Sequence, residues 1–225
     1  MDLVRFALAS FSASPLRTLE YERLAGLGLS GRVLDFGGGA RSSYRALLTG
    51  CRIASIDIDA GATPAIVADL TRRLPWRDGA FDAVTCLSCL EHLADFEGPI
   101  REAARVLRPG GRLVLCSPFL HRIHGAPDDY WRLSASALRR VIERCGLRVE
   151  RIDPLGKGVF VARYALLFEA IPRLVRPIFA AWAWVLDAVC SVISPRFRSA
   201  YGAAAFPLAY FVVAEKRSLA PPGEA

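Results

Sequence analysis

The residues with the clearest chemical potential are three consecutive glycines, Gly37 to Gly39, which directly follow a short apolar run containing Asp35. Glycine adopts backbone conformations that a side chain would forbid, so such a turn lets another group lie close against the backbone. Asp57 follows about 20 residues later, the spacing at which a carboxylate accepts hydrogen bonds from both hydroxyls of a ribose. A further acid, Asp69, comes after the next apolar stretch. The glycines and acids together predict a site for a nucleoside cofactor.

A second group of reactive side chains lies in the loop SPFLHRIHGAPDDYWR, residues 117–132. Its density of ionisable and aromatic groups exceeds what a connector needs. A histidine can remove the proton of an acceptor hydroxyl, so we predict His124 as a general base, with His121 as the alternate and Asp129 or Asp128 as its orienter. The sequence is equally compatible with Asp129 and its neighbours serving only to lock the loop by hydrogen bonds.

The elements that must position these residues alternate from residue 31 onward. Short apolar runs span residues 32–36, 52–58, 65–68, 80–86, 112–117, 147–152 and 206–214, and helical stretches span 42–48, 99–107 and 135–144. Such alternation is typical of an α/β fold with a mostly parallel sheet and helices on both faces. Ligands of such sheets bind beyond the carboxyl ends of the strands, which is where the glycine turn, the acids and the histidine loop fall.

Composition and charge narrow the classes of function. The 225-residue chain is 53% hydrophobic and has a net charge of +7, yet its arginines are scattered among acids, so we expect no nucleic-acid partner. The six cysteines lie mostly in apolar runs, and the pair Cys86 and Cys89 has neither a second pair nor suitably spaced histidines. We therefore expect reduced thiols in a cytoplasmic protein and no metal site.

Two other nucleotide-binding patterns fit the glycine turn less well. The window from Gly37 to Ser42 lacks the third small residue of G-x-G-x-x-G, so a nicotinamide cofactor matches only in part. No Gly-Lys-Ser/Thr follows, which excludes the phosphate loop of nucleoside triphosphatases. A NAD(P)-dependent oxidoreductase remains an alternative because the glycines and Asp57 fit it.

Five motifs in order, VLDFGGGA, SIDID, ADL, LPWRDGAFDAVTCLSCLEHL and REAARVLRPGGRLVLCSP, resemble the class I S-adenosylmethionine-dependent methyltransferases, especially the small bacterial type with an LEHL signature. The resemblance covers residues 31–153 and the strand near 206–214. It implies a Rossmann-like, doubly wound, mostly parallel seven-stranded sheet with an antiparallel last strand, here FPLAYFVVAEK. It also implies S-adenosyl-L-methionine as the cofactor.

By position, the resemblance assigns the parts of the cofactor to particular residues. Gly37 and Gly39 would approach the methionine part on a turn oriented by Asp35, Asp57 beside Ile58 would hold the ribose, Asp69 with Leu70 would meet the adenine, and Leu87 and Ser88 would lie near the sulfonium. Arg41 departs from the family by occupying its third glycine position. A similar His-x-x-Pro-x-Asp-Tyr-x-Arg pattern occurs at His124, Pro127, Asp129, Tyr130 and Arg132, whereas His92 of LEHL is expected to cap or pack.

Residues 158–199 form an insertion before the last strand that holds much of the excess hydrophobicity. Its longest uncharged stretch, 177–186, is shorter than the roughly 18 to 20 residues that a bilayer crossing needs. The sequence is compatible with packing as a core or lid, with a homodimer face, or with peripheral membrane contact through Trp182, Trp184 and the flanking arginines.

The predicted organisation is a helical segment 1–30, a catalytic domain 31–157 and 200–217, the insertion 158–199, and a flexible tail 218–225. We predict transfer of a methyl group to a small-molecule, glycan or lipid-linked acceptor at oxygen, in the cytoplasm or peripherally on the cytoplasmic membrane. A non-catalytic methyltransferase-like interaction protein is the other alternative.

Overall fold

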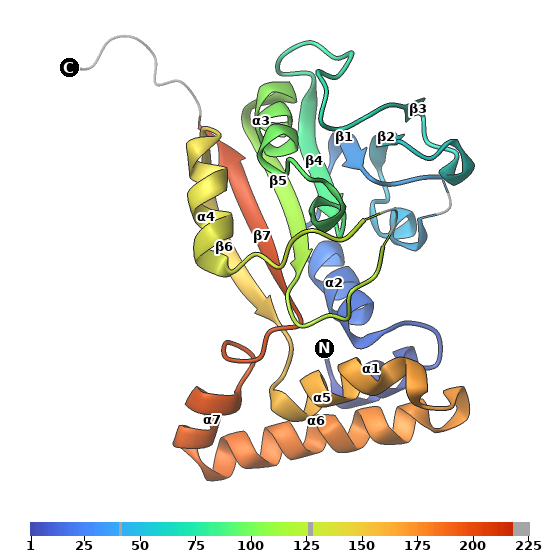
Figure 1. Cartoon of the computed structure of the whole chain (residues 1–225), viewed down its shortest axis with the longest axis vertical. Helices are drawn as coiled ribbons and strands as arrows, with labels where there is room; N and C mark the ends of the chain where they lie inside the picture. The colour runs from blue at the N-terminus through green and yellow to red at the C-terminus, as the bar shows by residue number, and fades with distance from the viewer. Residues whose placement is uncertain (41, 126–127, 218–225) are drawn as a thin grey trace, which may run out of the picture. The chain divides into compact units, whose positions relative to one another are not determined.

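The computed structural model describes residues 1–40, 42–125 and 128–217 (Figure 1). The predictions for Arg41, Pro127 and the tail 218–225 lie outside the described residues. The chain divides into two compact units. The helical unit comprises Met1–Leu27, Pro118–His124 and Asp153–Phe211, and the sheet unit comprises Gly28–Ser117, Gly125–Ile152 and the chain from Val212 onward. The N-terminal segment and the hydrophobic insertion, which the sequence suggested as separate segments, therefore group together.

Seven strands form a sheet in the order β3-β2-β1-β4-β5-β7-β6. They are β1 (Gly31–Phe36), β2 (Cys51–Asp57), β3 (Ile66–Val67), β4 (Phe81–Leu87), β5 (Leu107–Pro118), β6 (Leu147–Leu155) and β7 (Ala209–Lys216). β1 pairs in parallel with β2 and β4, β2 with β3, and β4 with β5. Figure 1 shows β7 running antiparallel to its neighbours. The predicted Rossmann-like, mostly parallel seven-stranded sheet is confirmed.

The sequences of the central strands are continuous apolar runs because other elements cover both faces of the sheet there. Val33, Leu34, Val84 and Leu115 are fully buried. Two helices of the sheet unit, α3 (Glu97–Val106) and α4 (Ala135–Arg144), fall close to their predicted positions. Ser134 caps α4, since the backbone N–H of Ala137 donates to the hydroxyl of Ser134 at 3.3 Å.

Two local predictions were wrong. The helix expected over residues 42–48 is a short 3₁₀ helix, η1 (Ser43–Leu47), whose Tyr44 side chain is drawn into a buried hydrogen bond with Asp35. The strand expected over residues 112–117 begins earlier, because Arg108, Pro109, Gly110 and Gly111 lie within β5 and not in a loop before it. Gly110 has φ +73°, and the pairing of β5 with β4 shifts register between Phe81 and Ala83, so an irregular strand start accommodates these residues.

The helical unit begins with α1 (Leu3–Ala9) and α2 (Pro15–Ala25), as predicted, and continues with α5 (Val159–Leu167), α6 (Arg176–Ile193) and α7 (Pro195–Tyr201). Short 3₁₀ turns precede α6, at Phe168–Ala170 (η4) and Arg173–Val175 (η5). Asp2 and Ser14 cap the first two helices through their side-chain oxygens.

One helical stretch, Arg173–Ile193, is long and apolar enough to cross a membrane by length and composition. The sequence prediction counted only uninterrupted apolar residues and therefore did not expect such a stretch. Only 17% of the 18-residue apolar window within it is buried, which distinguishes it from the core helix of a globular domain.

Candidate cofactor site

A cavity of about 400 Å³ opens in the sheet unit beyond the carboxyl ends of β1, β2 and β4. It is lined by residues that the sequence assigned to the cofactor, namely Gly37, Asp57, Ile58, Asp69, Leu70 and Ser88. The positions come from separate strand ends, which parallel pairing brings to one edge of the sheet.

The glycine turn leaves no room for side chains. Gly37 has φ +67°, in the left-handed region, and an added Cβ would meet Cys89 Sγ at 2.5 Å. At Gly38 an added Cβ would collide with the carboxylate of Asp35, and at Gly39 with the backbone carbonyl of Ala62. Of these glycines, Gly37 borders the cavity, whereas the N–H of Gly39 donates to Ser42 Oγ at 3.0 Å.

Asp35 lies beneath this turn and is fully buried. Its carboxylate accepts hydrogen bonds from Thr85 Oγ1 at 2.7 Å and from the hydroxyl of Tyr44 at 2.9 Å. Burial raises the pKa of Asp35 to about 6, although the hydrogen bonds from Thr85 and Tyr44 oppose the rise. The structure thus places Asp35 as a support of the glycine turn and not among the residues that line the cavity. Leu87 is also buried and does not line the cavity, whereas the next residue, Ser88, does.

The raised pKa of Asp35 predicts a pH-dependent stability. A group whose pKa is higher in the folded state contributes stability that is present below its unfolded value, near 4, and is lost as the pH rises through about 6. The difference in unfolding free energy between wild type and Asp35→Asn should therefore fall by roughly 2 to 3 kcal/mol between pH 4 and 7. Urea denaturation of both proteins across this pH range measures the difference. If the unfolding free energies of the two proteins changed with pH in the same way, the pKa of Asp35 would not be raised.

Two of the three acids that line the cavity, Asp57 and Asp69, differ in how many hydrogen bonds their oxygens already accept. Asp57 Oδ1 accepts the N–H of Asp59 at 2.8 Å, and Asp57 Oδ2 accepts no hydrogen bond from the described residues. Asp69 Oδ1 accepts both the N–H of Thr71, at 2.9 Å, and its hydroxyl, at 2.7 Å. These hydrogen bonds from Thr71 lower the pKa of Asp69, so this carboxylate is charged at neutral pH. Leu70, beside it, is buried and offers an apolar wall.

The segment after β5 is fastened to the LEHL segment, a contact that the sequence did not reveal. The N–H of Tyr130 donates to the carbonyl of Glu91 at 2.7 Å, and the indole N–H of Trp131 donates to the carbonyl of Leu93 at 2.9 Å. Nδ1 of His92 lies 2.6 Å from the carbonyl oxygen of Asp128. The two motifs therefore act as one structural block in the sheet unit.

The proposed catalytic residues fall in different surroundings. Arg132 binds the carboxylate of Asp129 through two hydrogen bonds, of 2.5 and 2.6 Å, a geometry that fits the loop-locking interpretation. His121 and His124 belong to the helical unit, where their ring centroids are 4.7 Å apart. Their assignment as bases stays a prediction.

Sequence reasoning missed five residues of the cavity: Asp59, Ala68, Cys89, His92 and Leu93. The alternation in SIDID places Asp59 two positions after Asp57, and that spacing was a signal for it. His92 packs as expected, against Asp128, but it also borders the cavity. The 3₁₀ turn Leu90–His92 (η3) brings Cys89, His92 and Leu93 to the cavity. No pattern in the sequence predicted that turn.

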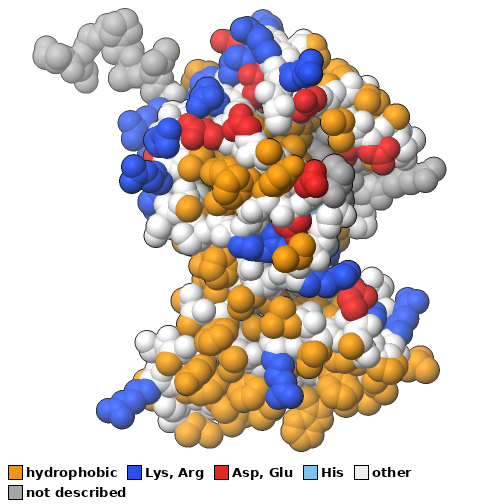
Figure 2. Space-filling model, viewed as in Figure 1, with side chains coloured by type: hydrophobic (Ala, Val, Ile, Leu, Met, Phe, Trp, Pro, Cys, Tyr) orange, Lys and Arg blue, Asp and Glu red, His pale blue; other side chains and the backbone are white. Residues whose placement is uncertain are grey.

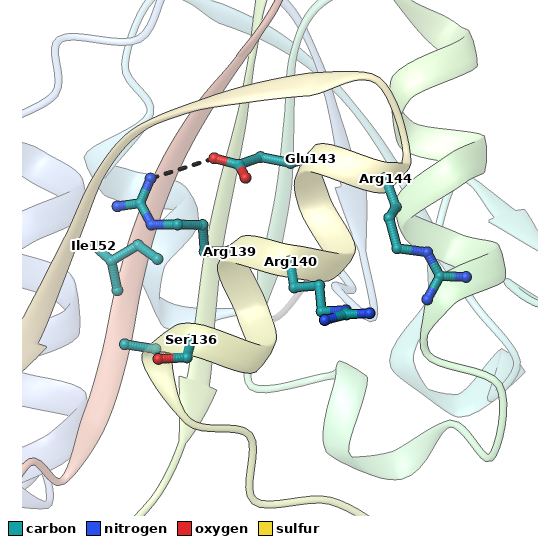
Figure 3. A pocket seen from close by; sticks show the side chains of 7 residues that line it. Ser136, Arg139, Arg140, Glu143, Arg144 and Ile152 are labelled. Carbon is teal, nitrogen blue, oxygen red and sulfur yellow. Dashed lines mark hydrogen bonds and ion pairs between the residues drawn. The ribbon is translucent and has the colours of Figure 1, made fainter.

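Another hollow, of about 830 Å³, lies on α4 in the sheet unit (Figure 3). Its lining is rich in arginine, and Arg139 Nη1 pairs with Glu143 Oε1 at 3.4 Å. It contains none of the motif residues and lies beside β6, at the far side of the strand order from β2 and β3. The glycine cavity is therefore the candidate cofactor site.

The fold defines a Rossmann-like class of protein. The structure superposes on the cyclase SpnF with a TM-score of 0.59 at 18% identity, covering 92% of this chain and 84% of that chain. It also superposes on 1,6-didemethyltoxoflavin-N1-methyltransferase from Burkholderia thailandensis, solved with S-adenosylhomocysteine, with a TM-score of 0.57 at 15% identity, covering 92% and 80%. These likenesses establish the fold alone.

Sequence comparison supplies the family. Residues 34–115 match the family model described as a methyltransferase domain. Demethylmenaquinone methyltransferase of Mycolicibacterium gilvum (strain PYR-GCK) is 40% identical over 94 residues, 38% of this chain and 41% of that protein. The protein of the same name from Tropheryma whipplei (strain Twist) is 34% identical over 165 residues, 66% of this chain and 62% of that protein. The chain thus spans less than two thirds of the length of these relatives.

The chain carries a class I S-adenosylmethionine-dependent methyltransferase domain, as its motifs predicted, and S-adenosylmethionine is the cofactor of that domain. The cavity fits this cofactor. Gly37, without a side chain, leaves its edge open, Asp57 Oδ2 can accept a ribose hydroxyl, and Leu70 offers an apolar wall for a base. The match to a methyltransferase domain favours methyl transfer over the alternative of a NAD(P)-dependent oxidoreductase.

Proposed function

We propose that the protein transfers a methyl group from S-adenosylmethionine to a small-molecule acceptor. The observation that carries the proposal is the cavity that joins the glycine turn to Asp57 and Asp69 at the strand ends. These are the residue types and the spacing that a nucleoside cofactor requires, and they lie on the domain that the family model matches.

The chain's own residues have binding and positioning roles in this proposal. The bound cofactor supplies an electrophilic methyl group, so the protein must align a nucleophile with it and exclude water. Asp57 would fix the ribose through its Oδ2, and Leu70 would pack on the base. The block formed by His92, Asp128 and Tyr130 would keep the rim of the cavity in place, because its hydrogen bonds join segments far apart in the sequence.

We further propose an apolar or lipid-linked small molecule as the acceptor, ahead of a glycan, with methylation at oxygen. The relatives' name, demethylmenaquinone methyltransferase, supports the apolar small-molecule acceptor, whereas methylation at oxygen rests on the histidine loop alone. His124, with His121 as the alternate, would take the proton of an acceptor hydroxyl. Nδ1 of each ring faces the carbonyl oxygen of Arg122, at 3.3 and 3.0 Å, so a neutral ring carries its proton on Nδ1 and uses Nε2 as the base.

Calorimetric titration with S-adenosylhomocysteine, with reduced nicotinamide dinucleotide as the control ligand, tests the cofactor. We expect one-to-one micromolar binding of the homocysteine compound and no heat from the dinucleotide. Absence of binding to either would favour the non-catalytic interaction protein.

Acceptors are then screened with donor labelled with ¹³C in its methyl group, beginning with hydroxylated quinones and lipid-linked glycans. NMR of the product identifies the methylated atom, and a methyl group on carbon or nitrogen would contradict methylation at oxygen. For a hydroxyl acceptor, His124→Gln should lower kcat while the affinity for S-adenosylhomocysteine stays unchanged.

A further inference from the structure

The helix α6 presents an apolar stripe to the outside of the helical unit. Ile178, Trp182, Val185, Val189 and Val192 follow one another at alternating intervals of four and three residues, which places them on one side of the helix. Their exposed fractions are 57, 64, 41, 46 and 84%. Single exposed apolar residues are ordinary, but a stripe along the whole of an 18-residue helix indicates a surface that something covers.

This stripe is not the side by which α6 packs into its own unit. Ala180, Ala183 and Asp187 form the buried side of the helix. The Asp187 carboxylate accepts the backbone N–H groups of Phe160 and Val161 at the start of α5, at 3.1 and 2.9 Å. The Trp184 ring lies 5.0 Å from that of Phe6 on α1. Contacts with α1 and α5 therefore satisfy the inner side and leave the outer stripe uncovered.

The apolar surface continues onto the first helix and its end. Val4, Leu8 and Phe11 recur at intervals of four and three residues and are 64, 58 and 37% exposed. Together with the exposed apolar residues of α6 they form what we call the α1–α6 face. Figure 2 shows hydrophobic side chains gathered over these lower helices, with only scattered charged side chains among them.

The charges around the α1–α6 face are predominantly positive. Residues 158–201 contain five arginines and two acids, and one of the acids, Asp187, is fully buried. Arg173 and Arg176 lie at the N-terminal end of α6, and Arg196 and Arg198 follow its C-terminal end. Between these ends the helix exposes no charged side chain.

We propose that the α1–α6 face lies in the interfacial layer of an anionic lipid bilayer, with α6 parallel to the membrane plane. The apolar stripe would enter the boundary between headgroups and acyl chains, Trp182 would sit at headgroup level, and the arginines at both ends would meet lipid phosphates. An orientation across the bilayer fits less well, because α6 is bound along its length to α1 and α5, and α1 exposes Asp2 and Arg5.

A second copy of the chain is a less suitable occupant on grounds of charge. Both ends of α6 are cationic, so parallel and antiparallel pairing of two such helices would each bring arginines together. Anionic headgroups neutralise the same arginines. The inference does not depend on methyl transfer.

A hollow of about 290 Å³ in the same unit supports a lipid environment. Its lining includes Tyr164, Leu167, Phe179 and Trp182, and Arg163 is its one charged lining residue. Phe179 and Trp182 are also exposed residues of α6, so the hollow adjoins the α1–α6 face. It has the lining that part of an acyl or prenyl chain requires.

Cosedimentation of the full chain with vesicles tests the proposal. Vesicles of phosphatidylcholine and phosphatidylglycerol at about three to one should bind the protein, and pure phosphatidylcholine should bind it more weakly. Val189→Glu with Val192→Glu should lower binding to the anionic vesicles at least about tenfold, because charges replace two exposed valines that the bilayer would cover. The control Arg139→Glu with Arg140→Glu on α4 lowers the net charge further, yet should change binding by less than about threefold.

Further measurements decide between the other occupants and orientations. Unchanged titration with S-adenosylhomocysteine and an unchanged melting temperature show that the valine variant is folded. Brominated lipids should quench tryptophan fluorescence most strongly when the bromine is near the headgroup, and Trp182→Phe should reduce that quenching. Equal binding of all variants, quenching strongest at the bilayer centre, or a lipid-free dimer that the valine substitutions dissociate would each overturn the proposal.

Discussion

Replacing Asp57 by alanine should lower the affinity for S-adenosylhomocysteine about 100-fold, because hydrogen bonds from ribose hydroxyls to a charged acceptor are worth roughly 1.5 to 3 kcal/mol each. Asp57 borders the cavity, and its Oδ2 accepts no hydrogen bond from the described residues. The side chain also accepts the N–H of Asp59, which holds the turn after β2. Isothermal titration calorimetry of the purified variant measures the loss.

Two further variants separate the ribose contact from this local support. Asp57→Asn keeps an oxygen for the N–H of Asp59 but removes the charge, so its affinity should fall between those of wild type and Asp57→Ala. Glu143→Gln, on the exposed side of α4, removes a negative charge of the same unit away from the cavity and should leave affinity unchanged. Wild-type affinity in Asp57→Ala would show that another residue holds the ribose.

Gly37→Ala is expected to weaken cofactor binding at least about tenfold and to destabilise the fold by roughly 2 kcal/mol. Part of this cost comes from the left-handed backbone, since Gly37 has φ +67°. The rest comes from the collision of the new Cβ with Cys89, whose Sγ and Cβ would lie 2.5 and 2.9 Å away. Cys89 borders the cavity, so its displacement changes the surface against which the cofactor packs.

Gly50→Ala is the matched control, because Gly50 has φ +84° and an added Cβ there meets nothing within 4 Å. Gly50→Ala should lose only the stability that the left-handed backbone costs, about 1 kcal/mol, and should keep full affinity for S-adenosylhomocysteine. Adding Cys89→Gly to Gly37→Ala removes the colliding atoms and should restore part of the affinity. Chemical denaturation and calorimetry measure both quantities, and equal effects of the two alanine variants would contradict a role for the collision.

The family match does not identify the acceptor. The cavity and its acids account for the cofactor, whereas a neighbour of the same fold is described as a cyclase, so the fold alone does not define the chemistry. The acceptor chemistry proposed here rests on the relatives' name and on the histidines at 121 and 124, and the labelling experiment decides it.

The amino-acid sequence determined the order of elements, the class of fold and part of the lining of the cofactor cavity. The apolar runs around Val33 and Val84 predicted buried strands because both strand faces are covered, and this pattern survives in local sequence. Gly37, Asp57 and Asp69 were predictable because each directly follows a strand, and parallel strands end at one edge of a sheet.

Tertiary structure alone decided which side chains are engaged with one another. Nothing local in the sequence indicated that Tyr44 and Thr85 would bind Asp35, or that Trp131 would reach Leu93. Such contacts depend on the three-dimensional path of segments up to 50 residues apart, as for Asp35 and Thr85. The same holds for α6: apolar residues occur all around the helix, and its packing against α1 and α5 selects the stripe that remains exposed.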